Sequence, residues 1–385
     1  MALSIFIAQA SFAGPREQAK RIHDRLTGVP ATNIVLDAME ATFASDSTGR
    51  DAAIYAINNS PSFYNVTVKN FASPWTNEAQ DVFVPLNDYS ATVIGLIRDN
   101  KDFRQVLHGN IIYTGSSYSP VDNLAFEQLE SSNADLSDIN VLRERVQSDV
   151  ITNLPSDATA GVMTTRAAAK AFFIDGTNRA MFRFTLMNHL CTDLEPLKDV
   201  SRTPDRVRQD VARSPGGDSR IYLNNCVGCH AGMDGMAGAF AHYQYVYPED
   251  NEDSGQLTYN ANKVEEKHLI NAGNFKPGYV TIDDSWINYW RNGQNSILGW
   301  SGGTLDNKGN AIGNGAKSLG IELSNSQAFA QCQVDKVFKS VCFKDPNDYA
   351  VDRNERDDIV SNFTSTYNYN MNDVFADVAA WCKGS

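Results

Sequence analysis

Hydrophobic residues recur every three to four positions along most of the chain, which is the spacing of an amphipathic helix. In the segment 178–191, Ala180, Phe184, Met187 and Cys191 fall at positions i, i+4, i+7 and i+11, so we expect one buried face there. Glycine and proline follow directly after the first predicted helix, as a helix stop requires. The pattern predicts helices over residues 16–26, 33–43, 50–58, 88–97, 103–107, 164–173, 178–191, 324–342, 354–363 and 372–382.

Two segments interrupt this helical pattern. Residues 61–88 are rich in proline, asparagine and aromatic residues, and we expect an irregular loop packed over a core. Residues 116–140 are polar and weakly periodic, so a domain boundary is predicted there, near residue 120. No β-hairpin or βαβ series stands out. The sequence therefore predicts a mainly α fold, with a helical N-terminal domain over 14–120 and a second domain with long loops and C-terminal helices over 121–385.

The start of the chain is apolar. Residues 1–13 end in Ser11-Phe12-Ala13 before Gly14, which is typical of the end of a signal peptide, although the positive start of such a peptide is missing. We expect a signal-peptide remnant and an exported protein, and a buried N-terminal strand or helix is the alternative. No apolar run reaches the roughly 18 residues that a membrane span needs.

One short stretch carries chemistry that can be named. Cys226, Cys229 and His230 form the pattern Cys-x-x-Cys-His, at which c-type haem is attached. On one helical turn the two thiols lie on the same side and can each form a thioether with a haem vinyl group, while His230 faces the iron as the proximal ligand. With six cysteines and six histidines in 385 residues, chance produces this pattern in about one chain in a thousand.

Two other kinds of site use paired cysteines. A thioredoxin-type redox motif needs a βαβ context, and a zinc site needs a second Cys-x-x-Cys or a His-x₃₋₅-His pair. The sequence contains neither. It therefore predicts one covalently bound haem c, held by Cys226 and Cys229 and ligated by His230.

Four cysteines lie outside the motif: Cys191, Cys332, Cys342 and Cys382. In an exported protein an even number suggests two disulfides, for which three pairings exist. Cys332 and Cys342 share one predicted helix, which separates them by about 15 Å, well beyond the reach of a disulfide. They should bond to Cys191 and Cys382, and we favour Cys342 with Cys382 because both end helices near the C-terminus.

The sequence leaves the second axial ligand of the iron open. Met233 and Met236 lie too close to His230 to reach the opposite face, so we expect them to be packing residues. Candidates by their distance along the chain are Met371, Met163, Met187 and His268. Each of these residue types is also common in protein interiors. An iron with no second side-chain ligand would suit peroxide or oxygen chemistry.

Other histidines, arginines and aromatic residues are further candidates. His189 and His242 could complete bis-histidine ligation, whereas His23 is expected at the surface. Arg220 and Arg291 could pair with haem propionates, with simple solvation as the alternative. Three tryptophans could wall the porphyrin or pack in the core: Trp286, Trp290 and Trp300.

Charge narrows the choice of partner. The formal net charge is −13 and the pI about 4.9, which argues against nucleic acid and anionic membranes. It favours a basic redox partner protein or simple solubility. Near the motif we expect an exposed turn over 214–218 and an acidic loop formed by Glu249, Asp250, Glu252 and Asp253, which could dock such a partner.

The residues around the motif resemble a bacterial family. They are Gly161-Val162-Met163-Thr164-Thr165-Arg166, Gly176-Thr177-Asn178-Arg179, Cys191, and Cys226-Val227-Gly228-Cys229-His230-Ala231-Gly232-Met233-Asp234. Together they are similar to the haem-binding module of the planctomycete-type c-type cytochromes, in which an Asp-Pro pair follows the motif; Gly235 stands here in place of that proline. Further segments resemble the helical modules that accompany the haem-binding module in this family: Arg25-Leu26-Thr27-Gly28, Leu86-Asn87-Asp88 and residues 326–337. The resemblance implies an exported monohaem protein and supplies no reaction.

These observations favour an electron-transfer cytochrome in the periplasm or on the outer surface of a bacterium. Two alternatives remain open at this point: a peroxidase-type haem enzyme with an open distal face, and a surface or scaffold protein whose haem is structural. The electron carrier needs only the motif and a closing ligand. The peroxidase needs a distal acid–base constellation that the sequence does not show.

Overall fold

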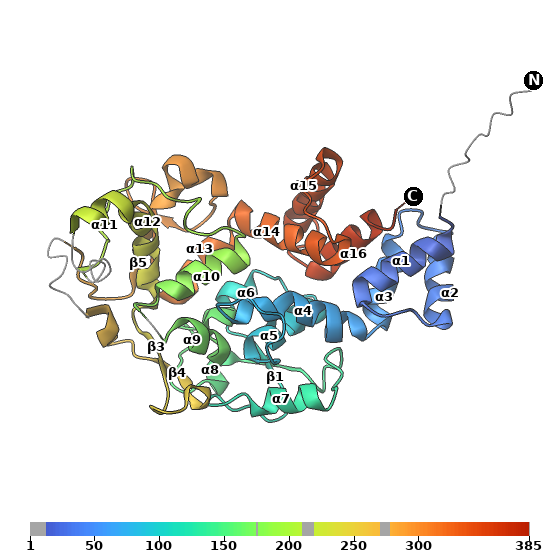
Figure 1. Ribbon diagram of the computed structural model, residues 1–385, viewed down its shortest axis with the longest axis horizontal. Helices are drawn as coiled ribbons and strands as arrows, with labels where there is room; N and C mark the ends of the chain where they lie inside the picture. Colours follow the sequence, from blue (N-terminus) through green and yellow to red (C-terminus); the bar gives the residue numbers. More distant parts are fainter. Residues whose placement is uncertain (1–12, 175, 210–218, 270–277, 385) are drawn as a thin grey trace, which may run out of the picture.

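The computed structural model confirms that the chain is mainly α (Figure 1). The structure describes residues 13–174, 176–209, 219–269 and 278–384. Within these ranges no helix combines the length and the apolar character needed to cross a membrane. The α-helices are α1 Pro15–Thr27, α2 Asn33–Thr42, α3 Arg50–Asn59, α4 Lys69–Ala72, α5 Asp88–Arg98, α6 Gln105–His108, α7 Leu124–Ser131, α8 Gln147–Val150, α9 Arg166–Phe172, α10 Arg179–His189, α11 Ser219–Asn225, α12 Val227–Ala237, α13 Gly315–Ser324, α14 Gln327–Val337, α15 Ala350–Ser365 and α16 Met371–Trp381.

Shorter helical segments connect these helices. Two of them are π-helical, η1 Phe63–Val68 and η10 Phe338–Cys342. The 3₁₀ turns are η2 Ser73–Thr76, η3 Gly161–Thr164, η5 Gly238–Phe240, η6 Glu252–Ser254, η7 Glu266–Leu269, η8 Tyr289–Arg291 and η9 Gly293–Leu298.

The last helix packs on the first ones. α16 lies against α3 and α1, and Arg50 of α3 forms ion pairs with Asp373 and Asp377 of α16. One hydrophobic core contains residues from Ala19 to Ala379 and continues across residue 120. The C-terminal helix, placed by prediction in the second domain, therefore contributes to the packing of the first. Whether the chain divides into two domains near residue 120 stays a prediction.

Short strands form three antiparallel sheets in the described part of the chain. One pairs β1 with β2, one pairs β3 with β4, and one has the order β5-β7-β6. The strands β3 and β4 form a hairpin that the sequence did not indicate, because residues 247–255 separate them and no two-residue turn of the Asn-Gly kind joins them directly. The strands are β1 Ile112–Thr114, β2 Arg143–Arg145, β3 Tyr243–Val246, β4 Gln256–Tyr259, β5 Ser285–Asn288, β6 Thr304–Leu305 and β7 Ala311–Asn314.

The expectation of an irregular loop over 61–88 is wrong for its first half. Residues 63–76 form η1, α4 and η2 in succession. Phe63, Tyr64, Phe71 and Trp75 are buried, and the rings of Phe63 and Phe71 pack edge-on against Phe375 of α16. Aromatic side chains on successive turns are thus anchored by tertiary packing, which outweighs the low helix propensity of the segment.

Two helix predictions also need correction. The helix predicted over 324–342 is broken, because α13 ends at Ser324 and Ser326 caps α14 by accepting a hydrogen bond from Phe329 N at 3.1 Å. On α10, Ala180 and Met187 are only half-buried. The fully buried residues of that helix include Phe182 instead, because α10 is covered on several sides rather than on one face.

Both predicted disulfides are confirmed. Cys342 is bonded to Cys382, and Cys191 is bonded to Cys332. Cys332 lies in α14 and Cys342 at the end of η10, which continues α14 directly, so the helical separation that excluded a Cys332–Cys342 bond holds.

Peptide mapping of the non-reduced protein should recover these two pairings. Replacing Cys342 and Cys382 together by serine should lower the free energy of unfolding by about 4 kcal/mol, because it releases a loop closed over a sequence separation of 40. Denaturant titration of the variant measures this loss. A Cys332–Cys342 peptide, or four free thiols, would contradict the assignment.

Candidate haem-binding site

The motif occupies the junction of two consecutive helices. Cys226 follows α11 and caps α12, and the backbone N–H groups of Cys229 and His230 both donate to the carbonyl of Cys226 at 3.2 Å. The three motif residues therefore share one helical turn, as predicted. All three are partly buried, and neither cysteine forms a disulfide.

The imidazole of His230, which packs edge-on against the ring of Tyr222, is held by a carboxylate. Its Nδ1 donates to Oδ1 of Asp234, one turn further along α12, at 3.2 Å. Asp234 is completely buried, and it accepts hydrogen bonds from Arg179 Nε at 2.7 Å and Arg179 Nη2 at 3.1 Å. No described residue forms a hydrogen bond with His230 Nε2. This nitrogen is therefore the one available to a metal.

The charge of Asp234 is stabilised by its neighbours. Burial by itself raises the pKa of this carboxyl, but Arg179, His230 and Arg208 outweigh burial and hold the pKa well below its usual value. The backbone N–H of Arg208 adds a further hydrogen bond to Oδ2 at 3.3 Å. A charged carboxylate thus faces the Nδ1–H of His230.

A short loop before α10 positions both arginines. Thr177 Oγ1 accepts from Arg179 Nη1 at 2.7 Å, and its carbonyl accepts from Arg208 Nη2 at 3.0 Å. Asn178 adopts a left-handed conformation with φ +59°, and its Nδ2 donates to the carbonyls of Phe240 and Tyr243. The residues 176–179, which carry part of the family resemblance, therefore anchor Asp234 from outside α12.

One face of α12 is made of glycines against which β5 and Trp290 pack. A Cβ at Gly232 would lie 2.0 Å from Trp290 Nε1, and one at Gly235 would lie 2.7 Å from the carbonyl oxygen of Ile287 in β5. Gly235 lies in the last turn of α12, where a proline would disrupt the helix. The departure from the Asp-Pro pattern is thus explained, because here the chain continues as a helix and leaves no room for a side chain.

The structure places the candidate iron ligands at different distances from the motif. Met371 and Met163 are buried in the hydrophobic core, and Figure 1 shows α16, which begins at Met371, well apart from α11 and α12. Of the three methionine candidates only Met187 belongs to a helix, α10, that packs on α12. Which side chain closes the iron stays a prediction.

His268 is an unfavourable ligand as it stands. Its Nδ1 accepts a hydrogen bond from Arg208 Nη1 at 2.6 Å, and since a guanidinium can only donate, the ring proton of neutral His268 must sit on Nε2. That nitrogen is buried and has no hydrogen-bond partner among the described residues. His189 is also buried and is hydrogen-bonded through Nε2 to Tyr89, while His242 lies 3.9 Å from a carboxylate oxygen of Asp284.

Several expectations about neighbouring residues are settled. Met233 and Met236 are core residues, as predicted. Arg291 is bound by both its Nε and Nη2 to Glu322, so it does not reach towards the motif as a free cation. His23 is buried and bonded through Nε2 to Ser60 Oγ at 2.9 Å, so its expected surface position is wrong.

The acidic loop does not lie beside the motif. It is the exposed turn of the β3–β4 hairpin, which Figure 1 shows below α11 and α12, at the lower edge of the same half of the molecule. Lys170 of α9 pairs with Asp253, and Arg166 donates to the carbonyl of Gly255 at 2.9 Å. The loop therefore belongs to another surface. The turn predicted over 214–218 lies outside the described residues.

The competing cysteine chemistries gain no support. Burial, followed by the negative charge of Glu195, raises the pKa of the Cys229 thiol, which is opposite to the shift of a reactive redox cysteine. Within the described ranges no three His, Cys, Asp or Glu side chains are grouped so as to hold a metal ion, so a zinc site is not indicated there.

Sequence reasoning did not assign roles to Asp234, Arg179 and Arg208. The spacing of His230 and Asp234, four residues apart on a helix, was a usable signal, because such residues face one another. Nothing in the sequence connects Arg208 to either of them. Its role depends on the tertiary fold.

The buried His268 predicts a loss of stability in mild acid. Burial, then the charge of Arg208, lowers its pKa to about 2 in the folded protein, whereas an unfolded histidine titrates near 6.5. Between these values only the unfolded chain binds the proton, so stability is lost as the pH falls below about 6.5, by about 2 kcal/mol between pH 7 and 5.

Denaturant titrations at pH 7 and pH 5 measure the loss of stability that His268 causes. In His268→Gln the amide oxygen can still accept the hydrogen bond from Arg208, so this variant should lose about 2 kcal/mol less than the wild type over that interval. An equal loss in both proteins would show that His268 is not held neutral.

No family model, curated protein or solved structure matches the chain. The resemblance to planctomycete-type c-type cytochromes therefore rests on the quoted residues. Several of those residues, Thr177, Asn178, Arg179 and Asp234, form the contacts that support His230.

Proposed function

We propose that the protein is an exported monohaem c-type cytochrome that transfers electrons, with the haem bound to Cys226 and Cys229 and His230 as its proximal ligand. One observation carries the proposal. A buried, charged Asp234 holds Nδ1 of His230, which leaves Nε2 of the same ring without a hydrogen-bond partner among the described residues. The two free thiols, Cys229 and Cys226, lie one and four residues before His230 in the chain.

The residues present fit a covalently attached haem. Two unbridged thiols in one turn and a ring nitrogen with a free lone pair are the groups that this attachment requires, and the carboxylate behind the ring supports the ligand. Trp290 Nε1, buried beside Gly232, also lacks an acceptor in the described part of the chain. When bound, the haem supplies a one-electron couple whose potential depends on the axial ligands and on the nearby charges.

The chain's own residues fix and polarise the ligand. Asp234 keeps the Nδ1–H tautomer of His230 and limits rotation of the ring, and its negative charge increases the basicity of Nε2. Arg179 and Arg208 balance that charge through their hydrogen bonds to the carboxylate of Asp234. The glycine face of α12 fixes the backbone that carries all three motif residues.

The remaining features are consistent with export and with a basic partner. Two disulfides are typical of proteins that fold in an oxidising compartment, which is where c-type haem is attached. The periplasm or the outer surface of a bacterium is the proposed location. A net charge of −13 supports a redox partner of opposite charge.

A peroxidase-type enzyme is the second candidate, and one contact favours it. A carboxylate bound to the proximal imidazole donates electron density towards the metal, which suits oxygen or peroxide chemistry if the opposite face of the iron is open. We rank it second because the structure identifies no acid–base pair for that face among the described residues.

Covalent attachment is tested on denaturing gels. After maturation in an oxidising compartment, the wild-type chain should retain haem stain, and a variant with Cys226→Ala and Cys229→Ala should lose it because no thioether can form. Asn225→Ala, an exposed change in the same turn, is the matched control and should retain the stain. Release of the haem from denatured wild-type protein would rule out the proposed attachment.

Carbon monoxide binding separates the two candidate functions. An electron carrier with both axial positions filled should not bind the gas rapidly when reduced, whereas an open iron should. In Asp234→Asn the midpoint potential should rise, on the order of tens of millivolts, because the ligand becomes a weaker donor. Asp37→Asn, which removes a partner of Arg16 between α1 and α2, far from α12 in Figure 1, is the control and should leave the potential unchanged. Rapid binding of carbon monoxide by the reduced wild-type protein would favour the peroxidase.

A further inference from the structure

A buried tyrosine and a buried histidine share a hydrogen bond that the proposed haem attachment does not use. The hydroxyl oxygen of Tyr89, on α5, lies 2.9 Å from Nε2 of His189, in the last turn of α10. Tyr89 is 3% exposed and His189 is completely buried. A phenol is a stronger acid than the N–H of a neutral imidazole, so the hydroxyl donates and Nε2 accepts. The proton of the neutral ring then lies on Nδ1.

The imidazole of His189 is oriented by this one side-chain hydrogen bond. Its Nδ1 has no hydrogen-bond partner among the described residues. The ring is otherwise surrounded by aromatic side chains: Trp75 packs edge-on with ring centroids 5.3 Å apart, and Phe329 and Tyr89 stack at 6.5 and 6.4 Å. A buried histidine with a purely structural role usually has both ring nitrogens satisfied. The arrangement here instead aims one basic nitrogen at one phenol.

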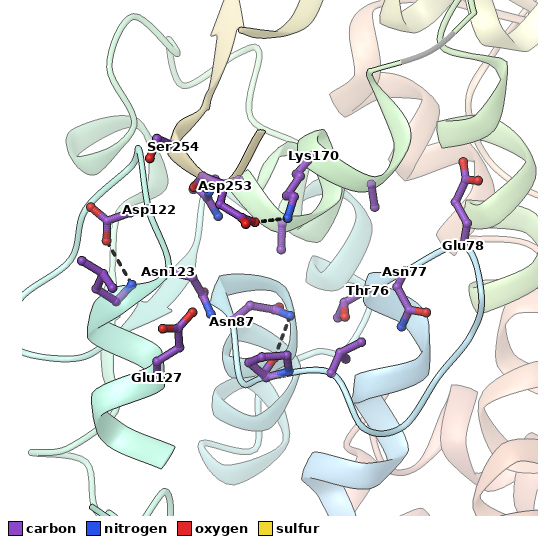
Figure 2. Close-up of a pocket in the computed structure, with 16 residues that line it drawn as sticks. Thr76, Asn77, Glu78, Asn87, Asp122, Asn123, Glu127, Lys170, Asp253 and Ser254 are labelled. Carbon is purple, nitrogen blue, oxygen red and sulfur yellow. Dashed lines mark hydrogen bonds and ion pairs between the residues drawn. The ribbon is translucent and has the colours of Figure 1, made fainter. Parts of the chain in front are cut away.

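Solvent does not serve as the base for this phenol. The pocket drawn in Figure 2, of about 680 Å³, is lined by Thr76 and Asn87 but by neither Tyr89 nor His189. Burial raises the pKa of Tyr89, so the hydroxyl keeps its proton in the resting protein. Removal of an electron from Tyr89 must therefore be coupled to transfer of its proton to a group inside the protein. Nε2 of His189 is in hydrogen-bond contact and is such a group.

The pair lies towards the end of α10 that leads to the haem motif. Arg179, the first residue of α10, binds Asp234, and the Cys229 thiol donates to the carbonyl oxygen of Leu194 at 3.7 Å. The chain after α10 therefore returns to the first turn of α12. Leu194 follows His189 by five residues, a reach of at most about 18 Å. The pair and the proposed haem thus belong to the same region of the fold.

We propose that Tyr89 is a redox-active tyrosine and that His189 is its proton acceptor. One electron passes from the phenol to a strong one-electron oxidant, of the class that peroxides produce at a metal centre. The O–H bond of Tyr89 breaks and an N–H bond forms at Nε2 of His189. The products are a neutral tyrosyl radical, an imidazolium and the oxidant reduced by one electron.

The proton transfer is favourable in this environment. A phenol that has lost an electron is a strong acid, so the imidazole takes the proton even though burial, then the charge of Lys336, lowers the pKa of His189. A second electron, from a reductant, returns the proton to Tyr89 and restores the pair. The chemistry of the pair does not depend on the haem. Only the source of its oxidant in the haem-loaded protein rests on the proposed function.

Electron paramagnetic resonance after rapid freezing tests the proposal on the full chain. The oxidant is trivalent ruthenium tris-bipyridine, generated by a light flash with persulfate as electron acceptor, so the result does not depend on the haem. The wild type should give a tyrosyl signal that Tyr89→Phe removes. Tyr243→Phe is the matched control and should keep the signal. Tyr243 is equally buried, but its hydroxyl donates at 2.6 Å to the carbonyl of Ala158, which is not a base.

Replacing the base separates proton transfer from hydrogen bonding. In His189→Gln the amide oxygen can still accept the hydrogen bond from Tyr89, but it does not take up the proton. The radical should form more slowly in this variant, on the order of a hundredfold. Radical formation in the wild type should also be slower in D₂O than in H₂O. The D₂O measurement decides the role of His189 if His189→Gln does not fold.

Hydrogen peroxide in place of ruthenium separates this inference from the haem proposal. A signal that depends on Tyr89 with both oxidants supports the pair and identifies the haem as the source of its oxidant. The same signal with ruthenium alone supports the pair and rejects the haem as that source. Absence of any signal that depends on Tyr89 overturns the proposal. So does a rate of radical formation that neither His189→Gln nor D₂O changes.

Discussion

The buried carboxylate of Asp234 is the point at which three separate segments meet. It links α12 to α10 through Arg179, and to the segment before residue 210 through the backbone of Arg208. A buried ion pair adds little net stability compared with apolar residues of the same size, but removing one partner costs about 3–5 kcal/mol. The arrangement therefore acts mainly by selecting one geometry, and that geometry sets the orientation of His230.

Steric contact fixes the backbone of α12, the helix that the Arg179–Asp234 ion pair orients. The approach of β5 to Gly235 and of Trp290 to Gly232 leaves no space for side chains on that face of α12. The helix can therefore rotate or shift only by separating from β5. Close packing of this kind resists small displacements. The positions of Cys226 and Cys229 follow from the same contacts, because both belong to the first turn of the helix.

Local patterns in the sequence predicted much of this structure, and long-range packing accounts for what they missed. Helical rise alone excluded a Cys332–Cys342 bond, and the Cys-x-x-Cys-His spacing placed three residues on one turn. The helical turns over 63–76 were missed because their stability comes from rings that pack on α16, about 300 residues further along the chain. The roles of Arg179 and Arg208 were missed for the same reason, since nothing near them in the sequence indicates a buried aspartate.

The helix α10 connects these features. Its first residue, Arg179, binds Asp234, and the chain just after its end is tied to α14 by the Cys191–Cys332 disulfide. His189 in its last turn is bonded to Tyr89 of α5. One end of the helix thus orients the proposed iron ligand, while the other is fixed to the core both covalently and by a buried hydrogen bond. The same disulfide that is typical of an oxidising compartment therefore also helps to fix the helix that holds Asp234 beside His230.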